Sequence, residues 1–228
     1  LAVIFFNQGR YAKAELHYQS ALVIREKLFG PNHLKLAMNL NNLAVLYVNQ
    51  GRYAEAEPIH RRVLAIREKA LSLDHPGVAQ SLNNLSSIFF KQGRYAEAES
   101  LSRRALAILE KVFGPNHPKV ALRLNNLAVL FKNQGRYAEA EVHYQRALEI
   151  SENIYGPDHS DVATSLHNLA NLYRKQGRYA EAESLYQRAL VIRKKILSPE
   201  HPALAKSLHN LAVLYNNQDR YAEAIMMS

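Results

Sequence analysis

The sequence has no cysteine and no tryptophan, and it has no run of about 18 apolar residues. Without cysteine, no disulfide framework can hold the fold together. Without a long apolar run, no membrane-spanning helix is expected. The first residues also show no secretory signal peptide. Since 48% of the 228 residues are apolar, we expect a packed core. The lack of cysteine fits a reducing compartment, and we expect a cytoplasmic location.

The usual sequence signs of catalysis are missing as well. No glycine-rich loop that could cradle a phosphate follows an expected strand, and no residues have the spacing of a metal-ligand cluster. No pairing of a nucleophile with a base can be identified. We therefore predict that the protein is not an enzyme and that it uses no cofactor and no metal.

What the sequence does contain is a repeat of 42 residues. The segment Asn-Gln-Gly-Arg-Tyr-Ala-Glu-Ala-Glu is complete at Asn49–Glu57 and at Asn133–Glu141. A glycine recurs at the same place in each unit, with an aspartate in the sixth: Gly9, Gly51, Gly93, Gly135, Gly177 and Asp219. A period of this length indicates a solenoid, in which each unit is covered by the next.

Each unit is predicted to contain two helices, separated by the repeated glycine. The first, helix A, is expected over about 74–91 in one unit, where Leu82, Leu85, Ser86 and Phe89 form an apolar stripe. Ser86 needs a backbone acceptor if it is buried. The second, helix B, is expected over about 137–154 in another unit. Side chains one residue before a repeated histidine are expected to cap helix A: Asn32, Asp74, Asn116 and Asp158.

The glycine that closes helix B is expected to adopt a positive φ at Gly30, Gly114 and Gly156. Ser72 and Ser198 replace it in two units, where we expect less regular turns.

These motifs resemble the tetratricopeptide repeat, in the 42-residue form of kinesin light chains and related bacterial proteins. The resemblance is carried by Leu124–Phe131, Gln134–Glu141, His143–Ile150 and Gly156–His159, and it extends over the whole chain. It implies an all-α, right-handed solenoid of antiparallel helix pairs. Armadillo and HEAT repeats have similar periods, but their hinges do not usually contain Gly-Arg-Tyr-Ala-Glu-Ala. The predicted array has partial units at 1–31 and 200–228 and complete units at 32–73, 74–115, 116–157 and 158–199.

An asparagine recurs in the middle of helix A, where asparagine is a poor helix former. It stands at Asn42, Asn84, Asn126, Asn168 and Asn210. In the tetratricopeptide family, helix A lines a concave groove, where such a side chain can bind the backbone or terminal carboxylate of a peptide. Alternatively, it bonds to the neighbouring helix and fixes the spacing of the units. The sequence leaves both roles open.

The neighbours of this asparagine vary between units, as expected if they choose the ligand. The predicted groove residues besides the asparagines above are Asn83, Asn125, His167, Ser87, Asn171, Lys91, Lys132, Arg174 and Lys175. Together with Lys206 they give a moderately basic strip, and the whole chain has a net charge of +9. We therefore predict a protein-interaction scaffold for an extended peptide that is acidic or carries a free carboxylate. The alternative is an ordinary solvated helix face.

The same residues allow other roles. RNA binding would need aromatic or arginine planes along the groove, where Phe90 is the only aromatic residue we can place. The five histidines that recur once per unit lie too far apart to share a zinc ion, so we expect them to stabilise the connectors by hydrogen bonds. A self-assembling or structural module remains a rival, because the incomplete end units are expected to expose apolar faces. These faces would be formed by Val3, Ile4, Phe6, Leu211, Tyr215 and Ile225.

Overall fold

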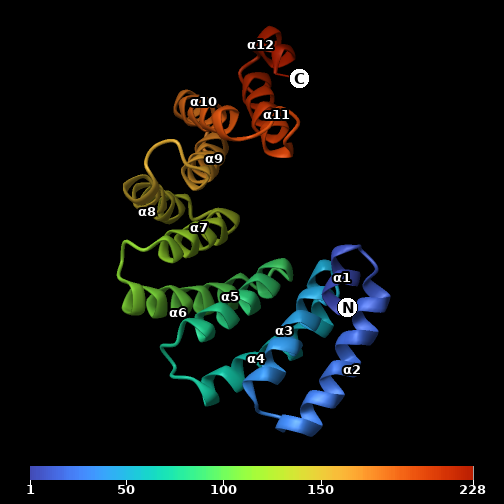
Figure 1. Ribbon diagram of the computed structural model, residues 1–228. Helices are drawn as coiled ribbons and strands as arrows, with labels where there is room; N and C mark the ends of the chain where they lie inside the picture. Colours follow the sequence, from blue (N-terminus) through green and yellow to red (C-terminus); the bar gives the residue numbers. More distant parts are fainter. Residues whose placement is uncertain (228) are drawn as a thin grey trace. The chain divides into compact units, whose positions relative to one another are not determined.

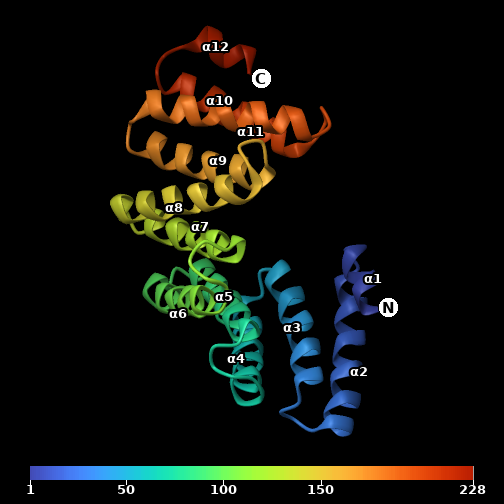
Figure 2. The ribbon, with the colours of Figure 1, turned by 60° about the vertical axis from the view of Figure 1, so that its left-hand side comes forward.

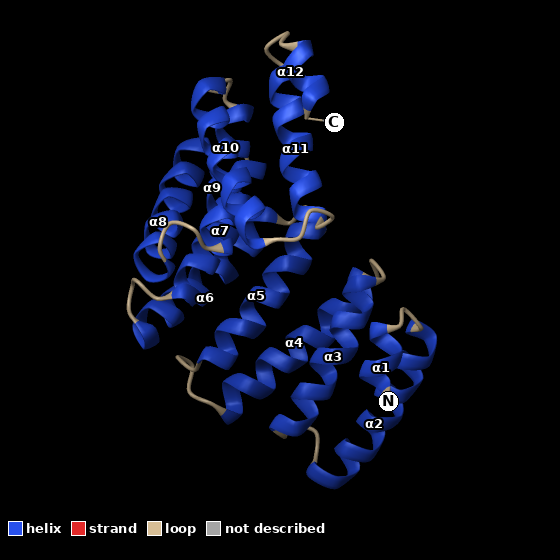
Figure 3. Cartoon of the chain, turned by 45° about the horizontal axis from the view of Figure 1, so that its top comes forward, coloured by secondary structure: helices blue, strands red, loops and turns tan. Residues whose placement is uncertain are grey.

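The computed structural model describes residues 1–227, which form α-helices joined by short connectors and include no strand (Figures 1 and 3). The helices are α1 (Ala2–Asn7), α2 (Tyr11–Phe29), α3 (Leu34–Asn49), α4 (Tyr53–Ala70), α5 (Pro76–Lys91), α6 (Tyr95–Phe113), α7 (Pro118–Asn133), α8 (Tyr137–Tyr155), α9 (Ser160–Lys175), α10 (Tyr179–Ile196), α11 (Pro202–Asn216) and α12 (Tyr221–Met226). Odd-numbered helices correspond to helix A and even-numbered helices to helix B. The all-α prediction is confirmed.

The helices gather into two compact units, one from Leu1 to Gly114 and one from Pro115 onward. Within each unit, every helix packs against the helices before and after it in the sequence. In the second unit, α7 and α9 also touch, so two successive A helices share a face. Figure 2 shows α8, α9, α10 and α11 side by side. Consecutive antiparallel pairs therefore form the architecture that the repeat predicts.

The repeated glycine ends helix A because it adopts a left-handed backbone conformation. Gly135 has φ 77°, and Asp219, which replaces the glycine in the last repeat, also has a positive φ of 59°. A Cβ at Gly135 would meet no heavy atom within 4 Å, so the turn requires the backbone freedom of glycine rather than its small size. The turns with serine in place of the second glycine are indeed different: α4 and α10 end one residue earlier and leave in an extended conformation at Leu71 and Leu197.

The caps of the A helices are histidines, and the prediction of asparagine and aspartate caps at Asn32, Asp74, Asn116 and Asp158 is wrong. Nδ1 of each histidine accepts a hydrogen bond from the backbone N–H two residues later, at 2.9–3.2 Å. The capping residues are His33, His75, His117, His159 and His201. Each imidazole stands one residue closer to the helix than the predicted cap, where its acceptor reaches an unpaired N–H of the first turn. The predicted role of these histidines in the connectors is confirmed.

Small residues and paired polar groups fill the core between the helices. Ala128 and Ala170 are fully buried on their A helices. Ser86 takes the same place in its repeat and donates to the carbonyl oxygen of Ala98 at 2.8 Å, which confirms the expected backbone acceptor. Ser86 also pairs with Ser102 at 2.7 Å.

The arginine of the Gly-Arg-Tyr motif joins one repeat to the next. The guanidinium of Arg178 lies 3.8 Å from the ring centre of Tyr173 and binds the carboxylates of Glu181, in its own motif, and Glu141, in the preceding motif, at 2.6 and 2.7 Å. Tyr173 also donates to Glu141 at 2.9 Å. The same arrangement recurs in Arg52 with Glu15 and Glu55, Arg94 with Glu57 and Glu97, and Arg220 with Glu183 and Glu223. The last glutamate of the motif thus binds the motif arginine of the repeat that follows.

We expect Arg178→Ala to lower the midpoint of urea unfolding, because it removes a cation–π contact and an ion-pair network at once. Circular dichroism during urea unfolding measures the change. The matched control is Lys195→Ala, which breaks the single exposed pair with Asp158 and should lower the midpoint less. Equal losses in both variants would contradict the linking role of Arg178.

Candidate functional site

The predicted groove residues lie on the A helices, and part of the recurring asparagine set is used to join repeats. Nδ2 of Asn84 donates to Oδ1 of Asn41 at 3.0 Å, and its own Oδ1 accepts from Gln80 at 2.8 Å. Nδ2 of Asn210 faces Nε2 of His167 at 3.0 Å. At these two positions, the side chain bonds to the residue one place earlier in the preceding repeat. The spacing role, left open by the sequence, therefore has direct support there.

The other asparagines of this set are placed differently. Asn42 is exposed and Asn168 is half-buried, and neither side chain has a hydrogen-bond partner within residues 1–227. Asn126 is half-buried and takes part in contacts of its own. The set is thus not uniform: Asn42 and Asn168 keep free amides on the A-helix face, whereas Asn84 and Asn210 are already bonded within the protein.

The structure places His167 in the interior and not on a binding surface. It is 4% exposed, because Asn210 covers its Nε2 and the guanidinium of Arg193 approaches its Nδ1 at 3.4 Å. Burial lowers the pKa of His167 to about 4, and the charges of Arg193, Lys206 and Lys132 act in the same direction. His167 is therefore neutral at physiological pH, and it contributes to the site by supporting Asn210.

Asn171 is also used by the fold. Its Nδ2 donates to the carbonyl oxygen of His167 at 2.8 Å, and its Oδ1 accepts from the hydroxyl of Tyr186 at 2.8 Å. Ser87, which stands at the corresponding position two repeats earlier, is exposed. Asn83 is half-buried and has contacts of its own. Lys91, at the end of α5, is exposed.

Four cations gather on the A helices of the second unit: Lys132 of α7, Arg174 and Lys175 of α9, and Lys206 of α11. None of the four forms an ion pair with an acidic side chain among the described residues. Burial lowers the pKa of Lys132, and the charges of Lys175, Arg174 and Lys206 lower it further. Nε of Arg174 is buried without a hydrogen-bond partner. We call these four residues the basic cluster.

Several acidic residues of the second unit form ion pairs with other cations. Glu141, Glu181 and Glu183 bind the motif arginines. Asp158 pairs with Lys195 on α10. The basic cluster therefore concentrates positive charge that the neighbouring side chains leave uncompensated.

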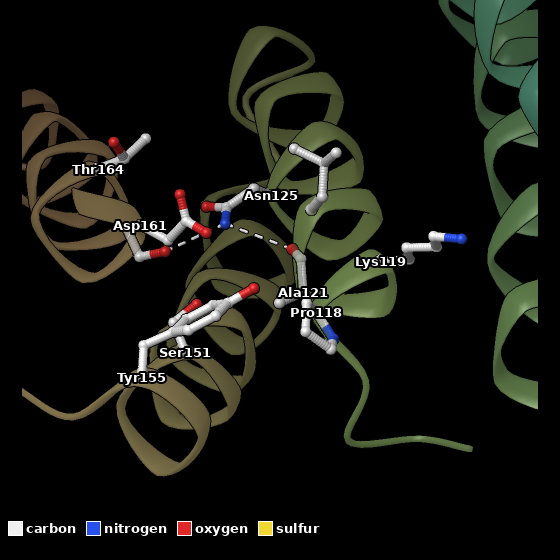
Figure 4. Close-up of a pocket in the computed structure, with 10 residues that line it drawn as sticks. Pro118, Lys119, Ala121, Asn125, Ser151, Tyr155, Asp161 and Thr164 are labelled. Atoms are coloured by element: carbon white, nitrogen blue, oxygen red, sulfur yellow. Dashed lines mark hydrogen bonds between the residues drawn. The ribbon is translucent and has the colours of Figure 1, made fainter. Parts of the chain in front are cut away.

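A pocket of about 280 Å³ between α7, α8 and α9 is not predicted by the sequence patterns. Figure 4 shows Asn125 of α7, Ser151 and Tyr155 of α8, and Asp161 of α9 around one space, while Lys119 points away from it. Asn125 is the one predicted groove residue in its lining. The available signal was position 151, where serine stands although the corresponding residues one repeat later and two repeats earlier, Arg193 and Arg67, are arginines.

Some predicted surfaces differ from expectation. Val3, Ile4 and Ile225 are more than half exposed, but Leu211 and Tyr215 are only 1% and 4% exposed, because α11 packs against α10 and α12. The predicted apolar face at α11 is therefore wrong for these two residues. Of the helices described, none is long and apolar enough to cross a membrane. Over the same residues, no three His, Cys, Asp or Glu side chains gather as metal ligands.

The chain resembles several proteins of known structure. A search of curated proteins finds no significant match. BtubC (BKLC) from P. vanneervenii superposes with a TM-score of 0.79 and 23% identity, over 96% of this chain and 87% of that chain. A chain from Podosopora anserina, named for kinesin light chain and its nearly identical TPR-like repeats, gives a TM-score of 0.72 and 28% identity, over 86% and 92%. Pseudomonas aeruginosa pilF gives 0.65 and 19%, over 100% and 85%.

The family assignment follows from the repeats themselves. A family model described as tetratricopeptide repeat matches in five overlapping segments, at residues 1–69, 36–111, 77–153, 122–194 and 161–228. Together, these segments span the chain, and the paired helices agree with them. The chain therefore belongs to the tetratricopeptide repeat family, and its 42-residue units are of the kinesin-light-chain-like kind.

Proposed function

We propose that the protein is a non-catalytic interaction module whose A-helix face binds an extended peptide that is acidic or carries a free carboxylate. Repeats of this family generally act as scaffolds for protein–protein interaction. The observation that carries the finer proposal is the basic cluster. Its four cations lie on three A helices and form no ion pair with an acidic side chain within residues 1–227.

The electrostatics of Lys132 explain why an anionic ligand would bind there. Its ammonium group is partly desolvated and close to other cations, so its pKa is lowered. A carboxylate at the cluster would favour the charged form of Lys132 and offset this repulsion. The guanidinium of Arg174 would add a charge-assisted hydrogen bond. The free amide of Asn168, in the same unit as the cluster, would hold the peptide backbone, since an amide offers both donors and an acceptor.

The test is a charge reversal with a matched control. We expect Lys132→Glu combined with Lys175→Glu to weaken the binding of acidic peptides at least tenfold, as measured by fluorescence anisotropy on peptides selected from an array. Lys69→Glu combined with Lys194→Glu makes the same change in net charge at exposed positions of B helices, and it should alter the affinity less than twofold.

Three outcomes would overturn the proposal. Equal losses in both double variants would mean that net charge, and not the basic cluster, attracts the peptide. If no acidic peptide binds but single-stranded RNA binds with a strong dependence on salt, the cluster serves nucleic acid instead. If nothing binds and light scattering shows concentration-dependent assembly, the module is a self-associating one.

A further inference from the structure

One position of helix B decides whether the space between two successive A helices is filled. It is occupied by Arg67 in α4 and by Arg193 in α10. Nη1 of Arg67 donates to the carbonyl oxygen of Gly77 at 3.0 Å and to the hydroxyl of Ser81 at 2.8 Å, both on the next A helix. Arg193 reaches Ser207 of the next A helix at 2.5 Å and also approaches His167 at 3.4 Å. An arginine at this position thus lies in a slot built to receive a guanidinium.

In α8 the same position is Ser151, whose hydroxyl donates to the carbonyl oxygen of Ala147 at 2.9 Å and does not extend into the slot. The slot is open there, and it is the pocket of about 280 Å³ between α7, α8 and α9. The residues that would receive the guanidinium are nevertheless present. Ser165 corresponds to Ser207, and Asn125 corresponds to His167, each 42 residues earlier. The pocket therefore keeps the acceptors of the slot without its arginine.

The hydrogen bonds of Asn125 show that this pocket is incompletely satisfied. Its Nδ2 donates to the hydroxyl of Ser165 at 3.1 Å and to the carbonyl oxygen of Ala121 at 3.3 Å. The bond to Ala121 fixes the orientation of the amide, because a carbonyl oxygen can only accept. Oδ1 of Asn125 is then left buried without a partner, which is unfavourable. The amide of Asn125 thus binds the hydroxyl of Ser165, whose counterparts Ser81 and Ser207 bind Arg67 and Arg193.

We propose that this pocket receives an arginine side chain from a bound peptide. The guanidinium takes the place that Arg67 and Arg193 occupy in their repeats and donates to Ser165, and the amide of Asn125 turns so that Oδ1 accepts from it. The carboxylate of Asp161, on the pocket wall, supplies the opposite charge. The ring of Tyr155, stacked on His159 with 4.1 Å between centroids, gives a flat wall on which a guanidinium can lie. A lysine ammonium lacks the planar shape that can lie on this ring while its edge donates to the other groups.

The pocket and the basic cluster together define a motif in the peptide, and this step rests on the proposed function. Asn125 and Lys132 are seven residues apart on α7, which is about 10 Å along the helix axis. An extended peptide covers this distance with about three residues. The partner is therefore expected to carry an arginine about three residues from an acidic residue or from its terminal carboxylate.

The first experiment tests the pocket alone, by NMR titration of the whole chain with N-acetyl-arginine-N-methylamide. We expect saturable shifts, in the millimolar range for so small a ligand, at the amides of residues 121–125, 151–155 and 161–165. The citrulline analogue, which has the same shape without the charge, should bind at least fivefold more weakly. Shifts that are absent, or equal for both compounds, overturn the proposal.

Variants make the test specific. Ser151→Arg should fill the slot from within the protein and abolish the shifts, whereas Ser184→Arg, at an exposed serine of α10, should leave them unchanged. Asp161→Asn serves as the test if Ser151→Arg fails to fold. Because Asp161 is exposed, this substitution should not disturb folding. It should weaken the binding about threefold to tenfold. Full retention of arginine binding in folded Ser151→Arg, or in Asp161→Asn if the former does not fold, would overturn the proposal.

A second experiment separates this inference from the proposed function. Blocked peptides carrying three consecutive glutamates are compared with and without an arginine three residues away, on either side. We expect the arginine on one side to increase the affinity about tenfold and its replacement by citrulline to remove the increase. If acidic peptides bind equally with and without arginine, the arginine slot is wrong while the basic cluster stands. If the peptides fail to bind but the arginine compound still shifts the amide signals of the pocket, the proposed function is wrong while the arginine pocket stands.

Discussion

Lowering the pH from 7 to 4.5 should reduce the free energy of unfolding by about 2–3 kcal/mol for each of two buried histidines, His60 and His167. They are 1% and 4% exposed. Burial lowers the pKa of both to about 4, with Arg67 adding to the effect at His60 and Arg193, Lys206 and Lys132 at His167. Nδ1 of His60 has no hydrogen-bond partner, so nothing offsets the cost of a charge there.

The direction follows from the protons bound in each state. In the unfolded chain, histidine takes up its proton near pH 6.5, whereas the folded protein does so only near pH 4. Between these values the unfolded state binds more protons, so stability is full above about pH 6.5 and falls as the pH drops toward 4. The glutamates that bind the motif arginines, such as Glu55 and Glu181, have lowered pKa values. Their contribution is lost only at still lower pH.

Urea unfolding at several pH values between 7 and 4.5 measures this loss. His167→Asn is the matched variant, because asparagine stands at the corresponding positions Asn41, Asn83 and Asn125. The variant should lose the part of the pH dependence that belongs to the second unit. A slope between pH 6.5 and 4.5 that is the same in the variant and in the original protein would contradict the assignment to His167.

The sequence was sufficient for the backbone because local rules and the repeat agree. The repeated glycine predicts the positive φ at Gly135, and Asp219 in the same place of the last repeat keeps it. The early ends of α4 and α10 follow from the serine that replaces the second glycine. The helix caps were misassigned to Asn32 and its counterparts because imidazole is seldom considered as a capping acceptor, although it stands one residue nearer the helix.

The candidate site was harder to predict because it depends on contacts between repeats. A helical periodicity places His167 and Asn171 on the A-helix face, but it does not show that Asn210 and Tyr186 cover them. The basic cluster was predicted as a strip, since charge can be counted from the sequence. Its lack of ion pairs required the structure, because the sequence does not show that Glu141 and Glu183 bind the motif arginines. The pocket could have been found by comparing corresponding positions of the repeats, such as Ser151 and Arg193.

The same comparison between repeats predicts that two equivalent tyrosines respond to phenylalanine in opposite ways. Tyr144 and Tyr186 stand 42 residues apart and are 0% and 1% exposed. The hydroxyl of Tyr186 donates to Asn171, whereas the hydroxyl of Tyr144 is buried without a partner. The reason is that Val129 stands where the next repeat has Asn171. Burial without a partner also raises the pKa of Tyr144 well above its ordinary value.

We expect Tyr144→Phe to raise the free energy of unfolding by about 1 kcal/mol, because it removes a buried polar group that is not hydrogen-bonded. Tyr186→Phe should lower it by about 1–2 kcal/mol, because it leaves Oδ1 of Asn171 without its donor. Urea unfolding of the two variants under identical conditions measures both changes. A loss of stability in both would show that the Tyr144 hydroxyl is satisfied after all, for instance by a bound water molecule.

A third substitution tests the cause and not only the outcome. Val129→Asn supplies the amide that Tyr144 lacks, with Nδ2 able to donate to the carbonyl oxygen of Asn125 as Asn171 donates to that of His167. In the presence of Tyr144, the new bond should offset the lower helix propensity of asparagine and the loss of apolar packing. In Tyr144→Phe, the same substitution should be destabilising. The double-mutant cycle should therefore give a coupling energy of about 1 kcal/mol between positions 129 and 144. A coupling near zero would mean that the residue at position 129 does not determine whether the hydroxyl of Tyr144 is hydrogen-bonded.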